Sequence, residues 1–122
     1  MTPKEMALLL AQAMDSKKGK DIRVLETDGV TTLADYFVLC SGSSAPQLKA
    51  LADAGEKAMK DHGILPHRVE GHRGGTWILQ DYGDVVVHVF DKEARAFYDL
   101  DRLWADAKTV DLSDVLAQPD AE

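Results

Sequence analysis

Residues 70–104 read EGHRGGTWILQDYGDVVVHVFDKEARAFYDLDRLW, and this stretch decides the fold. Gly83 and Asp84 separate two apolar runs, a pattern typical of the two-residue turn of an antiparallel hairpin. With that turn, position 82 faces 85, 80 faces 87, 79 faces 88 and 77 faces 90. The sequence therefore predicts two paired strands whose register is determined by the turn.

The two faces of this hairpin differ in composition, because successive side chains of a strand point to opposite sides. The aliphatic face, which suits a core, carries Ile78, Gln80, Tyr82, Val85, Val87 and Val89. The mixed face carries Trp77, Leu79, Asp81, Val86, His88 and Phe90. We expect the mixed face to be the one left partly open, since aromatic and Arg-rich patches are where interfaces concentrate their energy. For Trp77, His88 and Trp104, core and contact roles both remain open.

Capping and periodicity predict the remaining elements. Thr2-Pro3-Lys4-Glu5 and Ser44-Ala45-Pro46-Gln47 both have the pattern of a capping box that opens a helix. The second of these helices has an apolar stripe formed by Leu48, Leu51, Ala52, Gly55, Met59 and His62. Strands are predicted at 21–26, at 35–40 in the centre of the sheet, and at 67–71, with a turn at Arg73-Gly74-Gly75.

Asp91 is predicted to cap one last helix that starts at Lys92, with Phe97, Leu100 and Trp104 at helical spacing, and a final turn is expected within 110–116. The element order is then αββαβββα. It predicts an α/β fold: a single-domain mixed β-sheet of about five strands flanked by helices. We expect one domain over residues 1–110 and a short acidic C-terminal tail over 111–122, either solvated or used for docking.

Composition narrows the possible functions. The chain has 122 residues, 45% of them hydrophobic, and no apolar run approaches the length of a membrane span. Its start lacks the pattern of a secretion signal, and its one cysteine, Cys40, lies in an apolar strand, so we expect a cytoplasmic protein. A formal net charge of −7 argues against an affinity built mainly on phosphate contacts. A protein partner fits this charge better.

The candidate chemical motifs are incomplete. Ser41-Gly42-Ser43-Ser44 precedes a predicted helix, where backbone N–H groups can hold an anion, but the Gly-Lys-Ser/Thr ending of a Walker loop is missing. A cysteine phosphatase would need an arginine six positions after Cys40, and position 46 is a proline. His67, Glu70 and His72 do not share one side of a strand, so they make a poor metal site. We expect no catalytic residue, no metal and no cofactor.

Several motifs together resemble the ribosomal silencing factor family, also called the RsfS or Iojap family. They are Asp35-Tyr36-Phe37-Val38, Ser41-Gly42, Glu70-Gly71, Trp77, the run from Asp81 to Phe90, Arg95, Phe97-Tyr98 and Leu103-Trp104. The resemblance covers nearly the whole chain. It implies a nucleotidyltransferase-like topology without the catalytic carboxylates, since Val86, His88 and Phe90 stand where a strand would present acids.

The resemblance also implies a function. Members of the family bind the large ribosomal subunit through its fourteenth large-subunit protein, block association with the small subunit and repress translation under nutrient limitation, and a homodimer is implied for the free protein. The expected partner-binding residues are Trp77, Asp81, Tyr82, His88, Arg95 and Tyr98. No membrane and no sequence-specific nucleic acid are expected as partners. The alternatives are a nucleotide-binding or nucleotidyltransferase-like enzyme and a self-assembling structural module.

Overall fold

A parallel pair of apolar strands forms the centre of the sheet. The computed structural model describes residues 1–72 and 75–116, and its six-stranded sheet has the order β3-β4-β5-β2-β1-β6. The strands are β1 (Lys20–Glu26), β2 (Tyr36–Gly42), β3 (Arg68–Glu70), β4 (Trp77–Asp81), β5 (Val85–Asp91) and β6 (Lys108–Thr109). β2 and β5 are parallel and the other neighbouring pairs are antiparallel. The predicted mixed sheet is confirmed, with six strands instead of about five.

The predicted hairpin register is confirmed. Trp77 pairs with Phe90, Leu79 with His88 and Gln80 with Val87. The turn closes where the N–H of Tyr82 donates to the carbonyl of Val85 at 2.9 Å. Gly83 has a φ of +88°, a left-handed conformation that favours glycine, so the Gly-Asp pair at the turn has a direct backbone reason.

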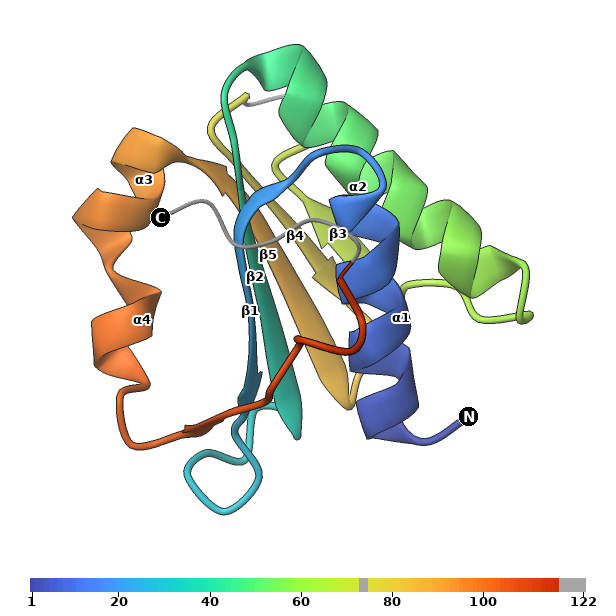
Figure 1. Ribbon diagram of the computed structural model, residues 1–122, viewed down its shortest axis with the longest axis vertical. Helices are drawn as coiled ribbons and strands as arrows, with labels where there is room; N and C mark the ends of the chain where they lie inside the picture. The colour runs from blue at the N-terminus through green and yellow to red at the C-terminus, as the bar shows by residue number, and fades with distance from the viewer. Residues whose placement is uncertain (73–74, 117–122) are drawn as a thin grey trace.

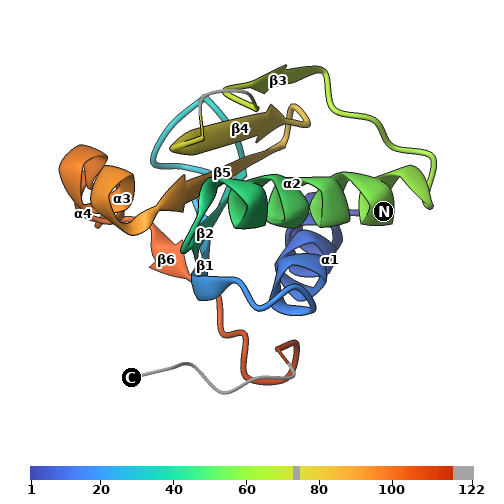
Figure 2. The same ribbon diagram turned by 90° about the horizontal axis from the view of Figure 1, so that it is seen from above.

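Two long helices, α1 (Pro3–Asp15) and α2 (Ala45–Lys60), cover one face of the sheet (Figures 1 and 2). Their apolar stripes pack on the aliphatic face of the hairpin and form the main core, to which Leu10, Met14, Leu48, Leu51, Met59, Ile78, Val87 and Val89 contribute. Each such side chain contributes about 1.5–3 kcal/mol by leaving water. The prediction that His62 belongs to the apolar stripe of α2 was wrong, because the helix ends before His62 and this residue is exposed.

Two short helices, α3 (Lys92–Tyr98) and α4 (Leu100–Leu103), lie on the opposite side of the sheet (Figure 2). They close a second, smaller core made of Leu25, Ala34, Phe37, Leu39, Val86, Phe90 and Leu100. Trp77 and Leu79 on β4 pack against this cluster and are only partly buried. The mixed face is thus covered less completely than the aliphatic face.

The predicted capping box is complete at the start of α1 and only partly formed at the start of α2. At α1, Thr2 Oγ1 accepts from the N–H of Glu5 at 3.1 Å, and Glu5 Oε1 accepts from the N–H of Thr2 at 2.8 Å. At α2, Ser44 Oγ accepts from the N–H of Gln47 at 3.2 Å, but the side chain of Gln47 bonds to Ser43 instead of to Ser44. The second capping box therefore lacks its return bond.

The prediction of one continuous last helix was wrong. Asp99 adopts a left-handed conformation with a φ of +48°, which ends α3 and starts α4 in a new direction. Leu100 and Trp104 still reach the second core, whereas Phe97 remains 80% exposed. The break also lets the chain continue to β6, which the sequence did not indicate and which pairs Thr109 with Leu25.

The segment after β6 returns along the main core. Val110, Leu112 and Leu116 pack against it while partly exposed, and the N–H groups of residues 115 and 116 bond to the carbonyl of Leu112 in the predicted final turn. The last six residues of the predicted tail, and two residues of the predicted turn at 73–75, lie outside the described residues. Within the described residues, no helix is long and apolar enough to cross a membrane.

A candidate partner-binding face

Trp77 is held in place on the mixed face by a buried histidine. Its indole Nε1–H donates to Nδ1 of His88 at 3.1 Å, and the two ring centroids are 5.7 Å apart. Burial lowers the pKa of His88 to about 4, so the imidazole is neutral near pH 7 and its nitrogen accepts this bond. His88 is only 6% exposed. Its predicted contact role is therefore indirect, through the orientation of Trp77.

Exposed apolar side chains continue this face onto the short helices. The rings of Trp77 and Tyr98 lie 4.5 Å apart, and those of Tyr98 and Phe97 lie 5.0 Å apart. Phe97 is 80% exposed, Leu103 65% and Tyr98 50%. We call Phe97, Tyr98 and Leu103 the α3–α4 ridge. Isolated exposed apolar residues are common, but the contacting rings of Phe97 and Tyr98 beside a half-buried tryptophan, with Leu103 exposed on the next helix, are typical of an interaction site.

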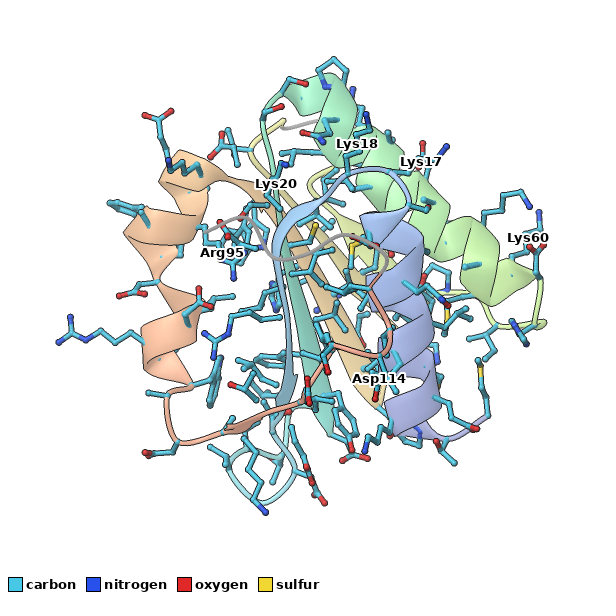
Figure 3. The ribbon with its side chains drawn as sticks, in the orientation of Figure 1. Lys17, Lys18, Lys20, Lys60, Arg95 and Asp114 are labelled. Atoms are coloured by element: carbon cyan, nitrogen blue, oxygen red, sulfur yellow. The ribbon has the colours of Figure 1, made fainter. Side chains whose placement is uncertain are left out.

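Arg95 anchors the ridge to the sheet and is not free for a partner. Its Nε and Nη2 donate to the two carboxylate oxygens of Asp101, each at 3.1 Å. Its Nη1 donates to the carbonyl of Asp21 at 2.6 Å and to Ser41 Oγ at 2.9 Å. The guanidinium also lies 5.7 Å from the centre of the Phe90 ring. Arg95, which Figure 3 labels between α3 and the sheet, therefore joins α3 to β1, β2 and α4.

Asp101 completes this anchor. Arg23 on β1 donates to its Oδ1 at 2.7 Å and reaches Thr109 Oγ1 at 2.8 Å, which ties in β6. Partial burial by itself raises the pKa of Asp101, but the hydrogen bonds and charges of Arg95 and Arg23 outweigh it, so the pKa lies below its ordinary value. Asp101 is therefore ionised near neutral pH and holds two arginines from different elements.

The two remaining predicted residues lie away from Trp77. Asp81 is on the same side of the sheet but at the other end of β4, where its Oδ1 accepts from the N–H of Gly83 at 2.8 Å and Arg68 lies 3.7 Å away. Tyr82 lies on the aliphatic face, 5% exposed, and its hydroxyl donates to Gln80 Oε1 at 3.2 Å. Burial raises the pKa of Tyr82. Tyr82 was expected to bind the partner together with Trp77, but the two residues lie on opposite sides of the sheet, because position 82 has the opposite parity on the strand.

Sequence reasoning missed Leu103 and the exposure of Phe97. Phe97 stood in the predicted apolar spacing of a continuous last helix, and the break at Asp99 removes that regularity. The available signal was the Asp99-Leu100-Asp101 segment itself, because an aspartate tolerates the left-handed conformation and favours the start of a new helix.

The turn at Ser41–Ser44 is occupied by internal bonds. Ser41 Oγ accepts from Arg95, Ser44 caps α2, and the N–H of Ser43 donates to Gln47 Oε1 at 2.6 Å. Val86, His88 and Phe90 are the side chains that β5 directs to the mixed face. Among the described residues, no group of three or more His, Cys, Asp or Glu side chains is arranged to hold a metal ion.

Fold and site together define a single-domain α/β protein with a mixed sheet, one face of which is sealed by two helices while the other ends in an exposed aromatic ridge. The family model described as "Ribosomal silencing factor during starvation" matches residues 1–122. The chain therefore belongs to the ribosomal silencing factor family.

Individual relatives agree with this assignment. The chain is 41% identical over 117 residues to the ribosomal silencing factor RsfS of Halalkalibacterium halodurans, covering 96% of this chain and 100% of the relative. It is 40% identical over 112 residues to RsfS of Bacillus subtilis, covering 92% and 95% of the two chains. The chloroplastic protein Iojap of Zea mays is 32% identical over 110 residues, covering 87% of this chain and 46% of the relative.

Solved structures confirm the fold. A crystal structure of a Chromobacterium violaceum protein superposes with a TM-score of 0.84 at 35% identity, covering 100% of this chain and 98% of the other. A crystal structure from Bacillus halodurans gives a TM-score of 0.79 at 39% identity, covering 89% and 99%. The family is named for a regulatory role, which agrees with the expectation of a non-enzymatic protein.

Proposed function

We propose that this protein binds the large ribosomal subunit through its fourteenth large-subunit protein and blocks association with the small subunit, so that translation falls under nutrient limitation. The observation that carries the proposal is the α3–α4 ridge beside Trp77, in a chain whose relatives are named ribosomal silencing factors. The mechanism is steric occlusion. A ligand that binds the free large subunit but not the joined ribosome shifts the equilibrium toward separated subunits.

The contact is assigned to the exposed side chains of the site. Phe97, Tyr98 and Leu103 provide apolar area, Trp77 contributes its exposed edge, and Asp81 lies toward the rim. His88 and Arg95 act from beneath, the first by orienting Trp77 and the second by holding α3. Large aromatic anchors surrounded by less critical contacts are the usual source of interface energy.

Charge supports a basic protein partner. The formal net charge of −7 attracts a basic ribosomal protein and opposes indiscriminate adhesion to RNA. In the free protein, we propose that a second copy covers the α3–α4 ridge in a homodimer, which must open before the ribosome is bound. The proposed site of action is the cytoplasm.

Sedimentation of the protein with separated ribosomal subunits tests the function. Added protein should migrate with the large subunit and reduce the joined-ribosome peak in proportion to its concentration. An unchanged joined-ribosome peak at several-fold excess of protein would show the functional assignment to be wrong.

Phe97→Ala tests the surface, because a side chain that is 80% exposed supports little of the fold. We expect binding to the large subunit to weaken at least about tenfold, as for an interface aromatic worth about 1.4 kcal/mol or more. Leu65→Ala is the matched control, since Leu65 is 59% exposed in the segment between α2 and β3. Equal affinities for the two variants would contradict the assignment of the α3–α4 ridge as the contact.

A further inference from the structure

Three lysines stand together in a chain that is otherwise acidic. Lys17, Lys18 and Lys20 lie within four consecutive positions and make up three of the fourteen lysines and arginines. Lys17 and Lys18 lie in the turn that joins α1 to β1, Lys20 is the first residue of β1 (Figure 3), and all three are exposed. We call them the lysine turn.

Within residues 1–72 and 75–116, no ion pair uses a lysine of the lysine turn. The salt bridges found within the described residues use other bases, namely Arg23, Lys57, Arg68, His72 and Arg95. Of the two neighbouring acids, Asp15 is buried, and Asp21 is the only exposed one. The segment from 16 to 21 therefore keeps a net positive charge although the whole chain carries −7.

Hydrogen bonds place the lysine turn between two other elements. Gln47 Nε2 donates to the carbonyl of Lys18 at 3.3 Å, which brings the turn beside the first turn of α2. Arg95 Nη1 donates to the carbonyl of Asp21 at 2.6 Å, which brings it beside α3. The positive end of a sixteen-residue helix thus adds to the lysines, and the lysine turn adjoins the helix that carries Phe97 and Tyr98.

We infer that the lysine turn binds the phosphate backbone of ribosomal RNA next to the protein contact made by the α3–α4 ridge. The inference rests on the proposed function and names a second component of the same partner. Lysines are compact, strongly hydrated point charges on flexible stems, suited to phosphates whose exact geometry varies. The lysine turn presents no exposed apolar side chain that a protein interface core would need.

RNA contact at this one place agrees with the net charge. An overall charge of −7 keeps the protein from adhering to RNA at random, and three local lysines engage phosphates only when the ridge has already docked. A purely structural role would be stabilisation of the C-terminus of α1 by nearby cations, worth about 0.3–1 kcal/mol. That role accounts for Lys17 and Lys18 but not for Lys20, which belongs to β1.

The test compares two triple variants of the full chain with the same net charge. One is Lys17→Gln, Lys18→Gln and Lys20→Gln. The control is Lys4→Gln, Lys60→Gln and Lys108→Gln, which removes three exposed lysines elsewhere, with Lys60 at the far end of α2 (Figure 3). Dissociation constants for the purified large subunit are measured between about 50 and 200 mM salt, the range in which phosphate contacts change affinity most.

The lysine-turn variant should bind at least about tenfold more weakly than the control at low salt, and its log–log salt slope should be smaller by about 2–3, since each lost phosphate contact removes about one unit. Its Tm should match that of the control. Ultraviolet cross-linking of the wild-type complex should give nucleotide adducts on a peptide that contains residues 17–20.

Three other results would overturn the inference in distinguishable ways. If the wild type binds the large subunit and the lysine-turn variant has the affinity and salt slope of the control, the proposed function stands and the RNA contact is wrong. If binding falls but ultraviolet light gives no nucleotide adduct at residues 17–20, and a carbodiimide, which condenses amines with carboxylates, joins the lysines to a ribosomal protein, the partner class is wrong. If the wild type does not bind the large subunit, the proposed function and the inference fail together.

Discussion

Asp101→Asn should loosen the α3–α4 ridge from the sheet without touching any residue of the proposed contact. The carboxylate of Asp101 accepts from Arg23 Nη1 at 2.7 Å and from Arg95 Nε and Nη2 at 3.1 Å each. An asparagine keeps one acceptor oxygen and replaces the other with an NH2 group, which faces a guanidinium donor with no bond to make.

The size of the expected stability loss depends on how deeply the two arginine partners of Asp101 are buried. The side chain of Arg95 is 11% exposed, so the bond that it loses cannot be replaced fully by water, and a hydrogen bond to a charged group is worth about 1.5–3 kcal/mol. The side chain of Arg23 is 36% exposed, so its share is reduced by solvent. We expect unfolding to become easier by about 2 kcal/mol, which lowers the Tm of a domain of this size by roughly 8 °C.

The assay is thermal unfolding at pH 7, with Asp106→Asn as the matched control, since Asp106 is exposed in the same segment and makes no ion pair within the described residues. The pKa of Asp101 is lowered in the folded protein, so its stabilisation is complete above the ordinary aspartate range and is lost as the pH falls through the folded-state pKa. The two variants should therefore converge in strong acid.

A result that would refute this reasoning is a Tm for Asp101→Asn within about 1 °C of the control at pH 7, a shift too small for a loss near 2 kcal/mol. The charge pair would then contribute no more than an ordinary surface salt bridge. If the Tm falls as expected, binding to the large subunit should fall with it, because the ridge that carries Phe97 and Tyr98 is held by this carboxylate.

Three further outcomes are expected. Between pH 6.5 and about 4, His88 is protonated in the unfolded chain but not in the folded protein, where burial lowers its pKa. The free energy of unfolding should therefore fall by about 1.4 kcal/mol per pH unit as the pH is lowered through this range. In denaturant titrations, His88→Gln should remove this contribution to the slope. Gly71→Ala should lower the free energy of unfolding, measured by calorimetry, more than Gly63→Ala does. Both glycines have positive φ, but a Cβ at Gly71 would collide with the backbone carbonyl of Trp77, whereas a Cβ at Gly63 would meet open space. Equal losses in the two variants would disprove the clash. The Cys40 thiol is buried and its pKa is raised to about 12, chiefly by burial, so a thiol reagent at pH 8 should modify it only as fast as the protein unfolds, and prompt labelling of the native protein would contradict this.

The pattern of residues was sufficient for the local structure of this protein. The Gly83-Asp84 turn predicted the hairpin register, because a two-residue turn allows only one pairing of the two strands on either side of it. Thr2 and Glu5 predicted the start of α1, and the apolar run before Ser41 predicted a central strand. Each of these features depends on neighbours within a few positions, and the family resemblance rested on the same motifs.

Tertiary structure decided which residues of the site meet. Asp101 and Arg23 are 78 positions apart, and their bond, together with those of Arg95, determines where α3 and α4 lie on the sheet. The left-handed Asp99 turns Phe97 outward and allows β6 to form, although local spacing favoured one helix. The error at Tyr82 is of another kind, because the alternation along the hairpin already placed this residue on the aliphatic face, where the structure buries it. What covers each side of the sheet, by contrast, depends on packing between distant segments.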